Sequence, residues 1–67
     1  MLPEEVLKHL FNVDRIAIQV VIQQKGEYTL NVADYGYINL LKLKDLFTKV
    51  GFDAFFVEQN LVVKNYF

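Results

Sequence analysis

The carboxyl-terminal half of the chain, residues 38–67, constrains the fold most because it predicts a helix, a sharp stop and a β-hairpin in that order. From Asn39, a residue type suited to the N-cap, apolar side chains recur at helical spacing as far as Val50. Gly51 follows, where a helix commonly ends in a left-handed residue. Residues 52–57 and 61–67 are rich in aromatic and β-branched side chains, which indicates two strands joined by a tight turn.

The turn of this hairpin decides which side chains face the helices, because a shift of one residue exchanges the two faces of a strand. A three-residue loop at 58–60 with Asn60 left-handed is the predicted connection, since a turn at Gln59 and Asn60 needs a left-handed glutamine. This register directs one apolar set toward the helices: Phe55, Val57, Leu61 and Val63. It directs another set away from them: Ala54, Phe56, Val62 and Tyr66.

The amino-terminal half predicts a similar series of elements. Pro3 suits the first turn of a helix, and an apolar stripe through Val6, Leu7, Leu10 and Phe11 extends that helix to about residue 12 or 13. In residues 15–23 large apolar side chains alternate with mostly polar ones, as they do in residues 27–33, which indicates two paired strands. A three-residue loop at 24–26 would join them and place Ile22 opposite Tyr28.

Helix, strand and strand are thus predicted twice, over residues 2–33 and 38–67. The segments Leu7–Phe11 and Leu43–Phe47 also agree at four of five positions, although two amphipathic helices can match so briefly by coincidence. The predicted fold is a single α+β domain spanning residues 1–67 with the order αββαββ. Its four-stranded antiparallel sheet carries both helices on one face, and the two halves are related by an approximate two-fold axis.

Composition limits the chemistry of this 67-residue chain. It contains no Cys, which excludes disulfides and thiolate metal sites, and its net charge is −1. No apolar run has the length of a secretory signal or a membrane span, so we expect a soluble, cytoplasmic protein with no membrane contact. The amino-terminal residues are acidic rather than basic, which agrees with this expectation.

Catalytic groups are scarce. Ser is absent as well as Cys, Thr29 and Thr48 carry the only aliphatic hydroxyls, and His9 is the single histidine. Asp34 and Asp53, both at predicted strand ends, form the best candidate acid–base pair, but aspartates there more often accept hydrogen bonds from turn amides. We therefore expect no enzymatic activity, no cofactor and no metal.

The predicted function is protein–protein interaction by a small intracellular subunit, adaptor or inhibitor that self-associates, with a homodimer as the expected state. Phe56, Val62 and Tyr66 on the outer face of the last hairpin are candidate partner-binding residues, as are Tyr35 and Tyr37 in the segment Asp34–Tyr37. One alternative is a nucleic-acid-binding regulator that uses Lys42, Lys44 and Lys49 of the second helix. Another is a phage or mobile-element protein that inhibits a host machine.

Overall fold

Four helices and three strands follow one another in the computed structural model, which describes residues 2–65. In chain order they are α1 (Glu4–Leu7), α2 (Asn12–Gln23), β1 (Glu27–Leu30), α3 (Val32–Tyr35), α4 (Tyr37–Lys49), β2 (Asp53–Val57) and β3 (Asn60–Lys64). The predicted α+β class is confirmed. No helix within residues 2–65 is long and apolar enough to cross a membrane.

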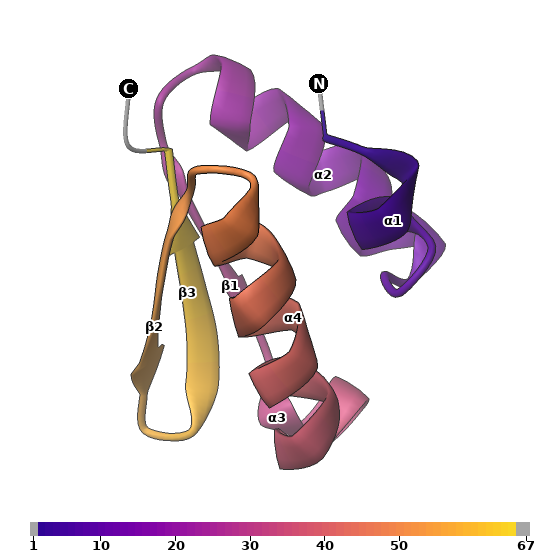
Figure 1. Cartoon of the computed structure of the whole chain (residues 1–67), viewed down its shortest axis with the longest axis vertical. Coiled ribbons are helices and arrows are strands. Elements are labelled where there is room, and N and C mark those ends of the chain that lie inside the picture. Colours follow the sequence, from indigo (N-terminus) through magenta and orange to yellow (C-terminus); the bar gives the residue numbers. More distant parts are fainter. Residues whose placement is uncertain (1, 66–67) are drawn as a thin grey trace.

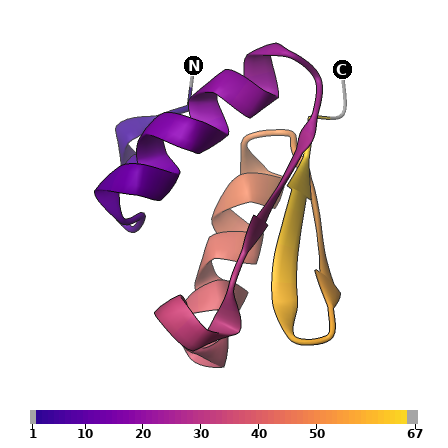
Figure 2. The same ribbon diagram turned by 180° about the vertical axis from the view of Figure 1, so that it is seen from behind.

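The three strands form an antiparallel sheet in the order β1-β3-β2, so the last strand lies in the middle. Helix α4 packs along one face of this sheet, and α1 and α2 lie together at one end (Figure 1). Seen from behind, α2 is in the foreground and connects directly to β1 (Figure 2). Among residues 2–65, no helix covers the opposite face of the sheet, which we call the outer sheet face.

The segment predicted as the first strand, residues 16–22, is helical, which corrects the sequence prediction. Ile18 and Ile22 are buried at helical spacing, whereas Ile16 and Val20 are 69% and 50% exposed. The apparent alternation arose because apolar residues occupy two opposite sides of one helix, and four of them also fall at every second position. Lys25, with φ of 59°, lies in the turn after α2 rather than in a hairpin loop.

The loss of that strand changes the topology. The structure describes three strands rather than four, and the order αββαββ is not confirmed. The β1 segment pairs with β3 from the far end of the chain instead of with residues 16–22. Helix, strand and strand follow one another only in residues 37–64, so the proposed half-repeats rest on the five-residue match alone.

The hairpin between β2 and β3 also differs from the prediction, because its turn contains two residues. Glu58 and Gln59 both have positive φ, 51° and 71°, and Val57 pairs with Asn60. Two left-handed residues match the twist of paired strands, although Asn and Gly adopt this conformation more readily than Glu and Gln. The sheet therefore gains a register one residue away from the expected one on β2.

This register exchanges the predicted faces of β2 but keeps those of β3. Phe56 pairs with Leu61 and Ala54 with Val63, and these side chains face the helices. Phe55 and Val57 lie on the outer sheet face with Val62. The prediction that Phe56 points outward is therefore wrong, whereas Val62 points outward as predicted.

Helix α4 is the element that the sequence predicted best. It ends at Lys49, and Gly51 is left-handed with φ of 97°. Asn39 is not its N-cap, because Gly36 occupies that position and the Asn39 side chain donates to the Tyr35 carbonyl oxygen at 2.7 Å. The first helix is shorter than predicted, since α1 ends at Leu7 and α2 begins at Asn12.

The core lies between α4, the inner face of the sheet and the amino-terminal helices. Its largest fully buried side chains come from five different elements and are Val6, Ile18, Leu30, Leu40, Leu43, Phe47, Leu61 and Val63. Phe11, predicted to be a core residue, is 50% exposed. It follows α1 in the connection to α2, which is why its side chain leaves the apolar stripe of the first helix.

Candidate functional site

A carboxylate that the sequence did not single out, Asp14, joins three elements of the fold. It lies in the first turn of α2, where the helix dipole favours a negative charge. The Tyr28 hydroxyl of β1 donates to Asp14 Oδ1 at 2.5 Å, and the Tyr35 hydroxyl of α3 donates to Oδ2 at 2.6 Å. Both oxygens of the carboxylate are therefore occupied by tyrosines from elsewhere in the chain.

The Tyr35 hydroxyl is also an acceptor. The Phe11 backbone N–H donates to it at 2.9 Å, and the two rings stack with centroids 4.5 Å apart. Burial, with a further contribution from Asp14, raises the pKa of Tyr28 to about 12. Burial and the same carboxylate raise the pKa of Tyr35 as well. Both hydroxyls stay protonated near neutral pH and remain hydrogen-bond donors to Asp14, and we call Asp14, Tyr28 and Tyr35 the clamp.

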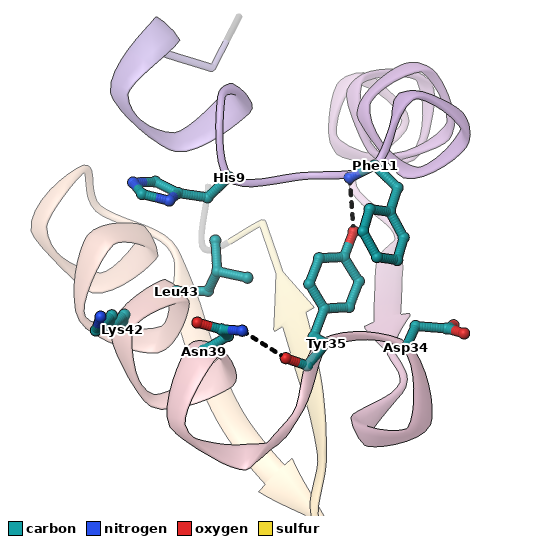
Figure 3. A pocket seen from close by; sticks show the side chains of 7 residues that line it. All are labelled: His9, Phe11, Asp34, Tyr35, Asn39, Lys42 and Leu43. Carbon is teal, nitrogen blue, oxygen red and sulfur yellow. Dashed lines mark hydrogen bonds between the residues drawn. The ribbon is translucent and has the colours of Figure 1, made fainter.

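A pocket of about 250 Å³ lies beside this clamp, between the α1–α2 connection, α3 and α4 (Figure 3). Its lining consists of His9, Phe11, Asp34, Tyr35, Asn39, Lys42 and Leu43. The side chains of Tyr35 and Asn39 already bond within the chain, to Phe11 and to the Tyr35 carbonyl. The pocket is smaller than the roughly 300–1,000 Å³ typical of small-molecule sites, and the hydroxyl in its lining, that of Tyr35, already donates to Asp14.

The predicted acid–base pair is not brought together. Asp34 belongs to α3 and lines the pocket, whereas Asp53 begins β2 and lies opposite Lys64 on the outer sheet face. The two elements meet opposite ends of the sheet, α3 near the β2–β3 turn and the start of β2 near α2 (Figure 1). Among residues 2–65, no group of three or more His, Asp or Glu could hold a metal ion.

The predicted partner-binding residues occupy different environments. Tyr35 is buried, with 7% exposure, and its hydroxyl is used by the clamp. Tyr37 is 48% exposed, and its ring packs against Phe56 on the helix side of the sheet, with centroids 5.1 Å apart. Val62 lies on the outer sheet face, while Tyr66 is outside the described residues.

The outer sheet face is apolar across its middle. Pairing aligns Thr29 of β1, Val62 of β3 and Phe55 of β2 in one row, and Val57 lies next to Phe55 on the same edge strand. Phe55 and Val57 are 36% and 49% exposed, whereas Val62 is nearly covered by its neighbours. The next row is charged and contains both signs, with Glu27, Lys64 and Asp53.

The lysines predicted for nucleic-acid binding lie in different surroundings on α4. Lys49 pairs with Asp45 at 3.2 Å, one turn away on α4, and both side chains are well exposed. Lys42 lines the pocket, and Lys44 is only partly exposed. A carboxylate on the same helix face lowers the attraction of these lysines for phosphate.

Compared with models of protein families, with curated proteins and with solved structures, the chain gives no match to any of them.

Proposed function

We propose that this chain is a non-catalytic protein-binding module, a small cytoplasmic subunit, adaptor or inhibitor, that contacts its partner through the outer sheet face. The observation that carries the proposal is the exposed pair Phe55 and Val57 beside Val62, on a face that no helix among residues 2–65 covers. Antiparallel sheets commonly leave one face in water, but that face is then mostly polar. An apolar middle row on such a face favours contact with another protein.

The edge strand β2 offers a second means of contact. It pairs only with β3, and its residues Asp53–Val57 include no Pro or Lys, the residue types that commonly protect an edge from further pairing. A partner strand added there would gain backbone hydrogen bonds, and its alternate side chains would cover Phe55 and Val57. Covering the exposed parts of those two side chains contributes about 1–2 kcal/mol.

The proposal is tested by capturing partners from a lysate of the source cells with the immobilised chain, followed by mass spectrometry. Val57→Lys places a charge on the outer sheet face, and Thr48→Lys makes a matched change at an exposed position of α4. We expect a specific partner to bind the wild type and Thr48→Lys but to be lost with Val57→Lys. Circular dichroism confirms that each variant is folded.

Two outcomes would contradict the proposal. A partner that binds Val57→Lys as well as it binds the wild type would exclude the outer sheet face. Recovery of nucleic acid, with affinity that falls steeply as salt is raised, would favour the nucleic-acid-binding alternative instead. A host enzyme or polymerase recovered as the partner would assign the inhibitor role among the binding functions.

A further inference from the structure

Helix α2 carries an apolar surface that points away from the core. Val13, Ile16 and Val20 are 71%, 69% and 50% exposed, and we call these three residues the α2 outer face. At about 100° per residue they fall within an arc of about 60°, on the side of the helix opposite Ile18 and Ile22. The helix is thus apolar on two opposite sides, one packed in the core and one in water.

The residues of α2 that flank its outer face are uncharged. Its exposed neighbours on the helix surface are Asn12, Gln23 and Gln24. The two charged residues of α2 point elsewhere, because Asp14 accepts hydrogen bonds from two tyrosines and Arg15 Nη2 donates to the Leu10 carbonyl at 3.3 Å. A strongly charged partner would therefore find no complementary charge on this surface, whereas a neutral apolar helix face would match it.

We propose that the α2 outer face is the interface of a homodimer in which α2 packs against α2 of a second copy, antiparallel about a two-fold axis. This inference rests on the proposed function in one respect, that the chain acts through protein contacts, but it uses a different surface. The sequence predicted self-association through the last hairpin, whereas the exposed side chains of α2 make the more extensive apolar face.

The second copy is favoured by the spacing and the charge of this surface. Residues at i, i+3 and i+7 repeat the pattern of a helix–helix seam, and an axis near the middle of α2 places Ile16 of one copy against Val20 of the other. Because the surface is uncharged, two identical copies meet there without repulsion, and the flanking amides can bond across the seam. A surface helix normally keeps its apolar side against the core and a polar side in water, so the second apolar side of α2 favours a further contact.

The size of the α2 outer face limits the expected affinity of the dimer. A standard interface buries about 800 Å² of each partner, which is a large share of the 4428 Å² accessible surface of this chain. A contact between two three-turn helices is smaller, so we expect a dissociation constant of about 10–100 µM. The protein would be monomeric when dilute and dimeric when concentrated.

Sedimentation equilibrium over a concentration range from about 5 to 500 µM tests the inference, because this range brackets the expected dissociation constant. The wild type should shift from the 7.9 kDa monomer to twice that mass. Ile16→Lys should remain largely monomeric, with its dissociation constant raised at least about a hundredfold by an unpaired charge in the seam. Ile38→Lys is the matched control, because Ile38 is 71% exposed on α4, and it should dimerise like the wild type.

A charge-swap experiment tests the geometry. Val20→Glu alone should also be monomeric, and mixing it with Ile16→Lys should restore a dimer, since the two new charges face each other across the seam. A monomeric wild type at the highest concentration, or a dimer that survives Ile16→Lys, would overturn the inference. A dimer lost with Val57→Lys but kept with Ile16→Lys would also overturn it, while leaving the proposed binding role of the outer sheet face intact.

Discussion

Replacing Gln59 by Gly should stabilise the protein, because Gln59 is left-handed in the two-residue turn between β2 and β3. Its φ is 71°, and the preceding Glu58 has φ of 51°. A left-handed conformation costs an ordinary L-residue about 1–2 kcal/mol, and Gly avoids that cost. Turns of this kind prefer Asn followed by Gly, whereas this chain has Glu followed by Gln.

The expected gain is smaller than the full conformational cost. Gly also increases the entropy of the unfolded chain, which removes about 0.4–1 kcal/mol of stability. The free energy of unfolding of Gln59→Gly should therefore rise by about 0.5–1 kcal/mol. For a domain of this size that corresponds to an increase in Tm of about 2–8 °C. Adding Glu58→Asn should increase it further.

Thermal and urea unfolding followed by circular dichroism measure this effect, with Gln24→Gly as the control. Gln24 has φ of −91°, so it carries no left-handed strain that Gly could remove, and Gln24→Gly should lower stability. Asn60→Gly separates the two registers, because Asn60 pairs with Val57 and its Oδ1 accepts a hydrogen bond from the Val32 N–H at 2.9 Å. Stabilisation by Asn60→Gly without stabilisation by Gln59→Gly would refute the two-residue turn. That result would support the three-residue loop, in which Phe56 lies on the outer sheet face.

Three further predictions concern the clamp, the core and one glycine. Because the pKa of Tyr28 is raised, its contribution to the free energy of unfolding is complete below about pH 10 and is lost as the pH rises through about 12. Tyr28→Phe should lower the free energy of unfolding by about 1.5 kcal/mol at neutral pH. Urea unfolding at several pH values should show that the variant loses less stability at alkaline pH than the wild type. Phe47→Ala removes a fully buried ring and should lower the free energy of unfolding by about 3–5 kcal/mol. Circular dichroism at 37 °C should then show that much of the population is unfolded. Gly36→Ala should cost about 1–3 kcal/mol from backbone strain alone, because φ is 80° and a Cβ there meets no atom within 4 Å; an unchanged Tm would contradict this.

The sequence predicted those elements whose residues signal one structure only. Helix α4 combines an apolar stripe with a left-handed Gly51, and both features appear in the structure. The β2–β3 hairpin was located correctly, since aromatic and β-branched residues flank a short polar segment there. Its register was missed because local preference disfavours Glu58 and Gln59 in a left-handed turn, and pairing along five residues of each strand outweighs that preference.

The candidate site was harder to predict because its parts come from distant positions. Asp14, Tyr28 and Tyr35 are separated by up to 21 residues, and no local spacing relates them. Tyr35 was identified as a candidate contact because tyrosines are common at interfaces, but its ring stacks on Phe11 and its hydroxyl binds Asp14. Asp14 lies between Val13 and Arg15 in the sequence, and this local context does not identify its partners.

The incorrect strand at residues 16–22 and the proposed dimer have the same physical origin. Six of the twelve residues of α2 are β-branched, a composition that favours strands, and they are divided between the core side and the α2 outer face. A helix of this length and composition is marginal by itself, so packing must stabilise it. The core packs only the side that contains Ile18 and Ile22. A second copy of α2 would bury the other side, which explains why β-branched apolar residues rather than polar helix formers occupy positions 13, 16 and 20.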